Sequence, residues 1–310
     1  MDADQCQDSD FKAYRHGTHR TVTPATTLQR AHPHLRAMGI TRIANITGLD
    51  RLGLPVVTVC RPNARSLAVS QGKGLDLDSA KASGVMESVE AYHAEHIDAA
   101  LRCGSLSDLS DSLHLADVSA LPKSAGNRFH EDLRLFWIEG HNRMDGSALW
   151  LPLETVSADY TLPLPPGHGC FAASTNGLAS GTTLEEAVAH GICEVVERDA
   201  VALWKLQGER PRRASAVDID TVDDPLCREA LGYFERAGVQ VKVWDVTSDV
   251  GIATFCCLAY GEEDDWADPE FGAGCHAARE IALLRALTEA AQARTTFIAG
   301  ARDDLGSALY

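Results

Sequence analysis

The first candidates for chemistry in this sequence are the polar residues of ASGVMESVE. Ser83, Glu87 and Glu90 are spaced i, i+4 and i+7, so a helix would carry them on one face. Their neighbours on that face are alanines, whereas a solvated helix face would interleave glutamates with lysines. Small side chains around two carboxylates leave space for a ligand to approach closely. The alternative is an ordinary acidic surface face.

The segment LEEAVAHGICEVVERDA repeats the acidic pattern on a second predicted helix. Glu186, His190, Glu194 and Glu197 share one face, and Arg198 lies at its edge. Valine and isoleucine cover much of the remaining surface, so we expect this helix to be largely enclosed. Carboxylates brought together repel one another and raise one another's pKa unless cations neutralise them. Mg²⁺ suits this role, because it takes one or two carboxylates together with phosphate oxygens and water.

A nucleotide could lie between two such acidic faces only if cations accompanied it. ATP carries on the order of four negative charges, so glutamates around it would require more than one Mg²⁺ ion and several basic side chains. Lys73 in SQGKG, Arg198 and Arg294 are the basic residues that we predict in this role. SQGKG lacks the GxxxxGK[ST] frame of a P-loop, so it is a weak signal by itself.

A third segment, RALTEAAQAR, places polar residues on a further predicted helix. Arg285, Glu289 and Gln292 fall at i, i+4 and i+7. In isolation this spacing is that of a helix surface, where an Arg–Glu pair contributes only a few tenths of a kcal/mol. The segment is a candidate for function only in combination with the two acidic helices.

Composition and charge narrow the classes of protein and partner. The chain has 310 residues, 45% of them hydrophobic, which suits one large α/β domain or two packed halves. A formal net charge of −16 argues against a general nucleic-acid surface, which needs clustered Lys and Arg. No apolar run approaches the roughly 20 residues that cross a bilayer, and the polar, acidic start is not a targeting signal. We therefore expect a cytoplasmic protein without nucleic-acid or membrane partners.

Nine cysteines are scattered along the chain without CxxC spacing. This pattern favours reduced, buried thiols over a disulfide framework or a zinc site. Cys256 and Cys257 lie in ATFCCLAY, a predicted strand, so their side chains should point to opposite faces. We expect every cysteine to be chemically dispensable, and Cys170 and Cys275, beside glycines, are the first candidates for an exception.

Strands interleaved with long helices are predicted to position these segments. β-branched runs on either side of a turn predict a hairpin of 40–48 and 54–62. We expect a loop with a short helix over 103–133 and an extended, proline-rich connection over 160–169. The pattern indicates an α/β (α+β) fold with mixed sheets covered by long helices. Predicted helices span 28–39, 79–102, 183–206 and from GAGCHAA (272–278) to about 299, and predicted strands span 66–74, 132–142, 148–156, 240–247 and 252–261.

Three blocks together resemble, in order and spacing, the YcaO family of ATP-dependent amide-activating enzymes over roughly residues 15–302. The blocks are SQGKG…ASGVMESVE, NGLASGTTLEEAVAHGICEVVERDA and RALTEAAQAR. The stretch GTHRTVTPATTL…GITRIANITGLDRLGLPVVTVCRPNARSLAVSQGKG is similar to the subgroup that works with TfuA partner proteins and is linked to thioamide formation. The resemblance implies a YcaO-like ATP-binding fold over 16–310, after a disordered or flexible segment at 1–15. It also implies that the chain ends early relative to typical members, without the proline-rich tail of azoline-forming relatives.

The resemblance implies roles for single residues as well. ATP and Mg²⁺ would be the cofactors, with Lys73 and Arg20 near the phosphates. Thr182 stands where many relatives have Asn in the turn before the second helix, so one nucleotide contact of the family is not carried over. The implied Mg²⁺ ligands are Glu87, Glu90, Glu194 and Glu197, and the implied nucleotide contacts are Ser83, Glu186, Arg198 and Gln292.

The implied reaction is the activation of a backbone amide in a peptide or protein substrate. Resonance makes an amide a poor electrophile. In the implied solution a nucleophile adds to the carbonyl and ATP phosphorylates the amide oxygen, which makes it a leaving group. Such phosphoryl transfer needs mainly positioning and charge neutralisation. For thioamide formation the nucleophile is an external sulfide equivalent, delivered with a TfuA-like partner, and the family suggests a homodimer.

Three alternatives stay open at this point. An azoline-forming cyclodehydratase would use a Cys, Ser or Thr side chain of the substrate as the nucleophile. A non-catalytic ATP-binding accessory protein in sulfur modification would bind nucleotide without substrate-dependent turnover. A carboxylate-bridged metallohydrolase would need ExxH pairs on both helices. Glu90-x-x-His93 has no such counterpart in the second helix, where His190 precedes Glu194.

Overall fold

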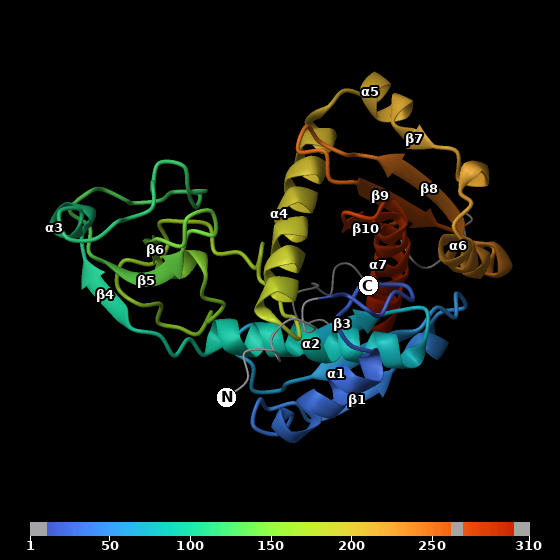
Figure 1. The fold of residues 1–310 in the computed structure, drawn as a ribbon, viewed down its shortest axis with the longest axis horizontal. Coiled ribbons are helices and arrows are strands. Elements are labelled where there is room, and N and C mark those ends of the chain that lie inside the picture. The colour runs from blue at the N-terminus through green and yellow to red at the C-terminus, as the bar shows by residue number, and fades with distance from the viewer. Residues whose placement is uncertain (1–10, 262–268, 301–310) are drawn as a thin grey trace, which may run out of the picture. The chain divides into compact units, whose positions relative to one another are not determined.

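A computed structural model describes residues 11–261 and 269–300, and the chain forms two compact units. The larger unit comprises the chain up to Asn63, Leu67–Glu90 and the chain from Ala179 onward. The smaller unit comprises Ala64–Ser66 and Ala91–Leu178, whose strands are drawn in green in Figure 1.

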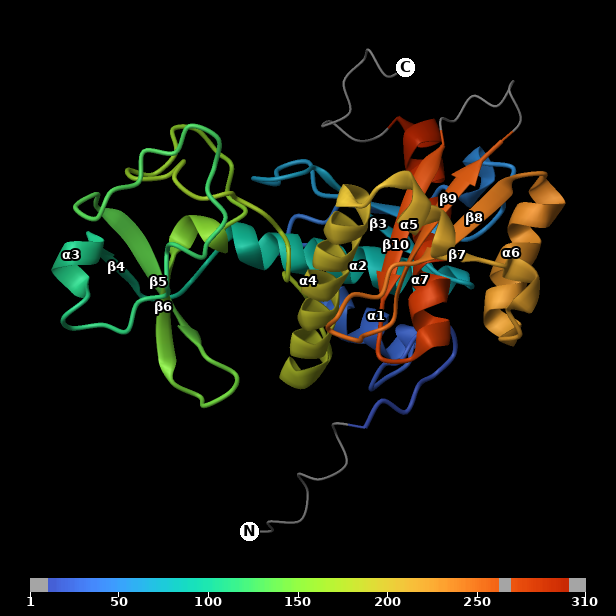
Figure 2. The same ribbon diagram turned by 90° about the horizontal axis from the view of Figure 1, so that it is seen from above.

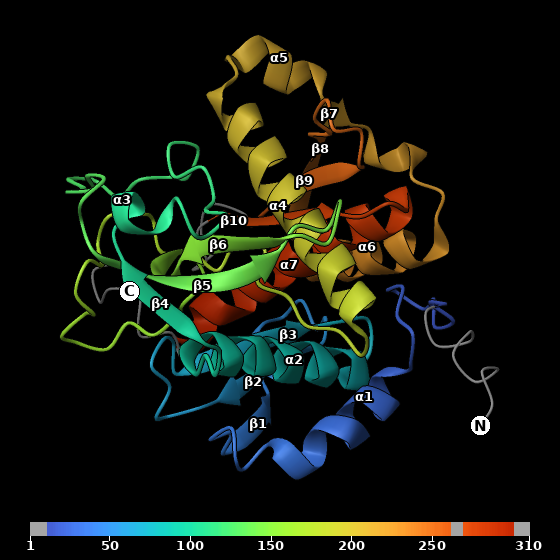
Figure 3. The same ribbon diagram turned by 60° about the vertical axis from the view of Figure 1, so that its left-hand side comes forward.

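One sheet of the larger unit is antiparallel, with the order β1-β2-β3. β1 (Arg42–Asn45) and β2 (Val56–Cys60) form the predicted hairpin, and β3 (Val69–Lys73) ends at the lysine of SQGKG. The sheet packs against α2 (Leu77–Glu95) through an apolar cluster (Figure 3). The first glycine of SQGKG, Gly72, is required by close packing, because a Cβ there would overlap the carbonyl oxygen of Ala80 on α2. The missing side chain lets the end of β3 pack directly on α2.

The helix predicted over 28–39 is wrong in its bounds. α1 (Pro24–Ala31) begins earlier, because the Thr23 hydroxyl caps it by accepting from the Thr26 amide at 3.2 Å and Pro24 takes the first helical position. A 3₁₀ turn at His32–His34 replaces the rest of the predicted helix. Pro33 in this turn lacks the amide hydrogen that would continue α1.

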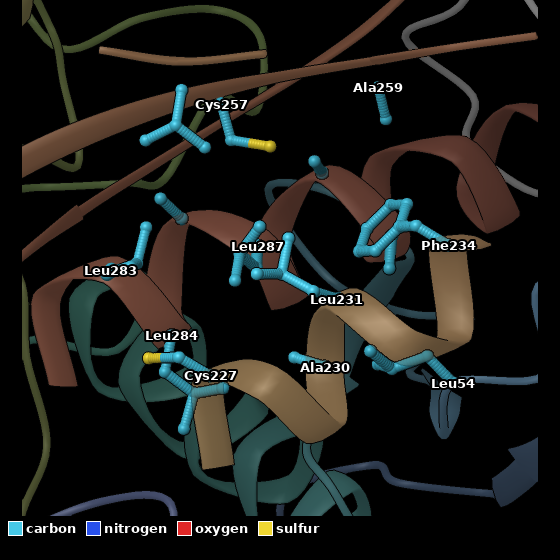
Figure 4. Close-up of a cluster of buried hydrophobic side chains, with 14 of the residues drawn as sticks. Leu54, Cys227, Ala230, Leu231, Phe234, Cys257, Ala259, Leu283, Leu284 and Leu287 are labelled. Carbon is cyan, nitrogen blue, oxygen red and sulfur yellow. The ribbon is translucent and has the colours of Figure 1, made fainter. Parts of the chain in front are cut away.

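The second sheet of the larger unit takes the order β10-β9-β8-β7 and is also antiparallel. α6 and α7 cover one face through the main hydrophobic core, with Cys257 on that side (Figure 4). α4 packs on the face that carries Cys256, so the prediction that the two cysteines point to opposite faces is confirmed. Figure 2 shows α7 lying along this sheet. The elements are α4 (Leu184–Leu206), α5 (Glu209–Ala214), β7 (Ala216–Val217), α6 (Pro225–Ala237), β8 (Gln240–Asp245), β9 (Thr254–Tyr260), β10 (Glu270–Cys275) and α7 (Arg279–Ala299).

The smaller unit is built on an antiparallel sheet with the order β4-β5-β6. Its core contains Trp137, Trp150 and Phe171, and the Trp137 indole donates to the Gly104 carbonyl at 3.0 Å. A short helix lies in the predicted 103–133 loop. The elements are β4 (Leu101–Gly104), α3 (Leu106–Leu109), β5 (Leu135–His141) and β6 (Ala148–Pro152).

Two fold predictions need correction. The helix predicted over 79–102 ends at Glu95, because Leu101–Gly104 pairs with β5 and this strand pairing overrides local helical periodicity. The sheets are antiparallel rather than mixed in every strand pair of the described ranges. The prediction of an α/β (α+β) fold with long helices covering sheets is confirmed.

The predicted flexible segment 1–15 falls mostly on residues 1–10, which lie outside the described residues. Within its last part, the backbones of Tyr14 and Arg20 exchange hydrogen bonds of 3.0 and 2.9 Å. In the part of the chain that the structure describes, no helix is both long enough and apolar enough to span a membrane.

Candidate functional site

The face of α2 that carries Ser83, Glu87 and Glu90 lies in the larger unit. Ser83 is half-buried and Glu87 is exposed. Glu90 accepts hydrogen bonds from the Ser180 amide at 2.9 Å and the Ser180 hydroxyl at 2.7 Å. Burial raises the pKa of Glu90, the Ser180 hydrogen bonds act against this, and the Glu194 charge raises it further. The acidic face of α2 therefore lies close to that of α4.

The start of α4 is fixed by Glu186, which is only 3% exposed. Its carboxylate accepts from the Arg20 guanidinium at 2.9 Å, the Thr21 amide at 3.0 Å and the Thr182 hydroxyl at 3.1 Å. Burial acts to raise the pKa of Glu186, but the hydrogen bonds from Thr21 and the Arg20 charge lower it overall. The sequence-predicted residues Arg20 and Glu186 are thus brought together. Thr182, the departure from the family pattern, supports Glu186.

Further along α4, Arg198 lies between two carboxylates. Its guanidinium contacts Glu194 at 3.1 Å and Glu197 at 3.0 Å. Burial, and then the charge of Glu289, raise the pKa of Glu197 to about 6. The charges of Arg198, Arg285 and Lys73 act to lower this pKa, but it stays above its ordinary value.

Glu289 on α7 is a further candidate site residue, which the sequence analysis did not select. It contacts the Lys73 ammonium at 3.0 Å and accepts from the Ala273 amide at 3.4 Å. Burial acts to raise the pKa of Glu289, but Lys73 and then Arg198 lower it overall. The only feature of the sequence that pointed to Glu289 was its helical spacing from Arg285 and Gln292. That spacing could not show that Glu289 faces Glu197 on another helix.

The Arg285 guanidinium on α7 forms a polar contact with the His190 imidazole on α4, with Nη2 and Nε2 2.5 Å apart. Burial, followed by the charges of Arg285 and Arg20, lowers the pKa of His190 to about 2. The neutral imidazole therefore accepts a hydrogen bond from Arg285. Two polar atoms of this region, His190 Nδ1 and Gln292 Oε1, are buried and have no hydrogen-bond partner among the described residues.

Arg294 does not belong to this group of side chains. Its guanidinium pairs with Asp50 at 2.9 Å, and both side chains are 2% exposed. This pair favours a structural role in the core, and the role of Arg294 beside a nucleotide stays a prediction. Helical spacing placed Arg294 near Gln292, but an arginine two positions further along a helix points in a different direction.

Charge and donor type test whether these residues fit Mg²⁺ and a nucleotide. Six glutamates face four cationic side chains, so the region keeps a negative balance. Within the described ranges, no three His, Cys, Asp or Glu side chains are arranged to hold a metal ion by themselves. Carboxylate oxygens are ligands that Mg²⁺ prefers, and it completes its shell with phosphate and water. The residues therefore fit a Mg²⁺-nucleotide. They are Glu87, Glu90, Glu186, Glu194, Glu197 and Glu289, with Arg20, Lys73, Arg198 and Arg285.

Comparison with known families identifies the class of protein. Residues 71–309 match the model of the YcaO cyclodehydratase family, described as ATP- and Mg²⁺-binding. The chain belongs to the YcaO family. This confirms the resemblance drawn from the three blocks, together with ATP and Mg²⁺ as the cofactors of the family.

Individual relatives agree with this assignment. A Rhizobium leguminosarum bv. trifolii protein, named "Uncharacterized protein in tfuA 3'region", is 38% identical over 94% of this chain and 70% of its own length. A heterocyclase solved with substrate and cofactor is similar with a TM-score of 0.74 and 27% identity, over 89% of this chain and 40% of that one. YcaO from Methanopyrus kandleri, solved with AMPPCP and Mg²⁺, shares the fold with a TM-score of 0.71 and 24% identity, over 92% of this chain and 71% of that one.

Proposed function

We propose that this protein uses Mg²⁺-ATP to phosphorylate the oxygen of a backbone amide in a peptide or protein. The product would be a thioamide, formed with an external sulfur donor and a TfuA-like partner. The observation that carries the proposal is the meeting of acidic faces from α2, α4 and α7 with too few cations to neutralise them. Burial raises the pKa values of Glu90 and Glu197, and the neighbouring charges of Glu194 and Glu289 raise them further.

The proposed roles follow from charge and position. Lys73, Arg198 and Arg20 would offset phosphate charge, and Glu289 would hold Lys73 in place through its 3.0 Å contact. Gln292, with a buried and unpartnered Oε1 in the described structure, would meet a donor group of the nucleotide. Ser83 and Glu186 would complete the nucleotide site. The proposed Mg²⁺ ligands are Glu87, Glu90, Glu194 and Glu197.

When bound, ATP supplies the phosphoryl group that turns the amide oxygen into a leaving group. The protein's own residues position that group and neutralise charge, which are the main requirements of phosphoryl transfer. His190 stays neutral next to Arg285, so this side chain adds no positive charge. Every proposed role is thus met by binding and electrostatics, without a protein nucleophile.

A relative's name supports the sulfur chemistry. The Rhizobium protein is named for its position beside tfuA, and it is 38% identical to this chain. The competing proposal is azoline formation, which the family description as a cyclodehydratase and the likeness to a heterocyclase favour. The two reactions share the activation step and differ in the nucleophile, so the same glutamates would serve both.

Calorimetric titration of nucleotide, with and without Mg²⁺, tests the activation site. We expect Mg²⁺-dependent binding of ATP to the wild type. Glu197→Gln should weaken it by at least about 100-fold, since even residues that only orient metal ligands contribute about 10–100-fold. Glu185→Gln is the matched control, because Glu185 is an exposed glutamate in the first turn of the same helix. Equal affinity in Glu197→Gln and Glu185→Gln would remove Glu197 from the metal site.

Product analysis separates the two nucleophiles. Short peptides would be incubated with Mg²⁺-ATP, sodium sulfide and a TfuA-type protein, and then analysed by mass spectrometry. The replacement of one backbone oxygen by sulfur supports the thioamide proposal. Sulfide-independent loss of water from a peptide containing Cys, Ser or Thr would support azoline formation instead.

A further inference from the structure

One serine of the larger unit holds a proposed Mg²⁺ ligand through two hydrogen bonds. Ser180 lies in the segment just before α4, and Glu90 lies on α2. The Ser180 amide donates to Glu90 Oε1 at 2.9 Å, and the Ser180 hydroxyl donates to the same oxygen at 2.7 Å. The other carboxylate oxygen, Oε2, accepts no hydrogen bond from the described residues. Since both oxygens of an ionised carboxylate carry lone pairs, Oε2 keeps its lone pairs for a ligand while Oε1 is held.

Close packing fixes the segment that carries Ser180. Gly181 passes so near the first turn of α4 that a Cβ there would lie 2.6 Å from the Ala187 amide nitrogen. The Ser180 hydroxyl also lies 3.4 Å from the Met86 carbonyl, one helical turn before Glu90 on α2. Ser180 is therefore held between the start of α4 and the backbone of α2.

The proposed ligands on α4 are held in a different way. Glu194 and Glu197 both contact Arg198, at 3.1 and 3.0 Å, so a metal ion at these carboxylates competes with a guanidinium charge. An amide and a hydroxyl hold Glu90, and these neutral donors orient its carboxylate without neutralising it. Ser180 therefore restricts the direction of Glu90 and leaves its negative charge for a cation.

We propose that Ser180 is a positioning residue for Mg²⁺, which orients Glu90 so that Oε2 is available to the metal ion. The inference deepens the proposed function and rests on it, because it requires Glu90 to be a ligand of the Mg²⁺-nucleotide. Mg²⁺ demands near-ideal octahedral geometry, whereas Ca²⁺ accepts flexible coordination. A carboxylate that is oriented beforehand therefore favours Mg²⁺. Groups that only orient metal ligands contribute about 10–100-fold to metal affinity.

Calorimetric titration of the protein with Mg²⁺-ATP and, separately, with Ca²⁺-ATP tests this role. Ser180→Ala removes the hydroxyl and keeps the backbone donor. We expect its affinity for Mg²⁺-ATP to fall by about tenfold or more, and its affinity for Ca²⁺-ATP to fall less, because Ca²⁺ tolerates a less ordered carboxylate. Ser180→Thr keeps the hydroxyl and should bind Mg²⁺-ATP with wild-type affinity. A general structural defect would weaken both complexes alike, so the ratio of the two affinities isolates the positioning role.

Ser79→Ala is the matched control. Ser79 also donates its amide and its hydroxyl to one carboxylate, that of Asp76, at 2.8 and 2.7 Å. Neither residue belongs to the proposed site, so Ser79→Ala should bind both complexes with wild-type affinity. If circular dichroism showed that Ser180→Ala is unfolded, Ser180→Gly would replace it, because glycine also lacks the hydroxyl.

Three results would overturn the proposal. They are equal Mg²⁺-ATP affinity in Ser180→Ala and Ser79→Ala, an equal loss of Mg²⁺-ATP and Ca²⁺-ATP affinity in Ser180→Ala, and the same loss in Ser180→Thr as in Ser180→Ala. Failure of the proposed function gives a different result, because the wild type itself would then not bind Mg²⁺-ATP. Mg²⁺-dependent binding by the wild type that Ser180→Ala retains in full refutes the positioning role alone.

Discussion

Two glutamates, one in each unit, are 6% exposed but are satisfied by different groups. Glu154 of the smaller unit accepts backbone hydrogen bonds from Gly169 at 2.6 Å, Cys170 at 3.2 Å and Phe171 at 3.1 Å. Glu197 of the larger unit has Arg198 at 3.0 Å and is opposed by the charge of Glu289. Backbone donors that converge on a carboxylate fix a loop. Carboxylates that oppose one another leave charge that a bound cation can neutralise. Burial alone therefore does not distinguish a structural glutamate from a functional one, whereas its partners do.

The buried pair of Asp50 and Arg294 should behave like Glu154 rather than like Glu197. Asp50→Ala leaves the Arg294 guanidinium in the core without its carboxylate, so we expect a loss of about 3–5 kcal/mol in the free energy of unfolding. Denaturant unfolding measures this loss. Among molecules that remain folded, the affinity for Mg²⁺-ATP should be unchanged. A variant of wild-type stability with weakened nucleotide binding would return Arg294 to the nucleotide site.

Glu154→Gln tests the structural half of the comparison. Glutamine keeps one oxygen for three backbone donors and adds an amide group, so we expect a loss of about 1–3 kcal/mol in the free energy of unfolding. Nucleotide affinity should stay at the wild-type value. Glu139→Gln, at an exposed position of β5, is a suitable control, with an expected change below about 0.5 kcal/mol. Equal stability of both variants would show that the backbone donors around Glu154 contribute little.

The pH dependence of stability tests the functional half. The pKa of Glu197 is about 6 in the folded protein and near 4.5 in the unfolded chain, so folding favours the protonated form. The resulting stabilisation is fully present below about pH 4.5 and is lost as the pH rises through about 6. Glu289 opposes Glu197, while Arg198, Arg285 and Lys73 partly compensate.

We therefore expect the unfolding free energy of Glu197→Gln, relative to ligand-free wild type, to increase between pH 5 and 7 by up to about 2 kcal/mol. Unfolding at a series of pH values in the absence of Mg²⁺ and nucleotide measures this difference. Glu185→Gln should differ from the wild type by a constant amount over the same range. A constant difference for Glu197→Gln would mean that the facing carboxylates do not interact.

Most of the helices and strands, and part of the candidate site, could be predicted from the sequence. The helical spacing of Ser83, Glu87 and Glu90 and the alternation in the 40–62 hairpin depend on local periodicity, which can be read without a structure. The end of α2 could not be predicted, since Leu101–Gly104 becomes a strand only through pairing with β5.

The remaining site information depends on packing between distant elements. Glu289 is functional in this proposal because α7, α4 and β3 bring it to Glu197 and Lys73, and no local pattern encodes that meeting. Helical spacing likewise could not show that Arg294, a basic residue near Gln292, pairs with Asp50 in the core.

Lys73 offers the smallest change in stability and the clearest separation of the two roles of charge. Its pair with Glu289 is partly exposed, with side chains 24% and 30% accessible, so Lys73→Met should reduce the unfolding free energy by at most about 1 kcal/mol. Calorimetry should nevertheless show Mg²⁺-ATP affinity weakened by about tenfold or more, because the phosphate loses a charge-assisted partner. Lys81→Met on α2 is the control, since Lys81 forms only a 3.9 Å pair with Asp78 and should change neither quantity measurably. If Lys73→Met lowered stability while affinity stayed constant, Lys73 would serve only to compensate Glu289, and the phosphate would have to be held by Arg198 and Arg20.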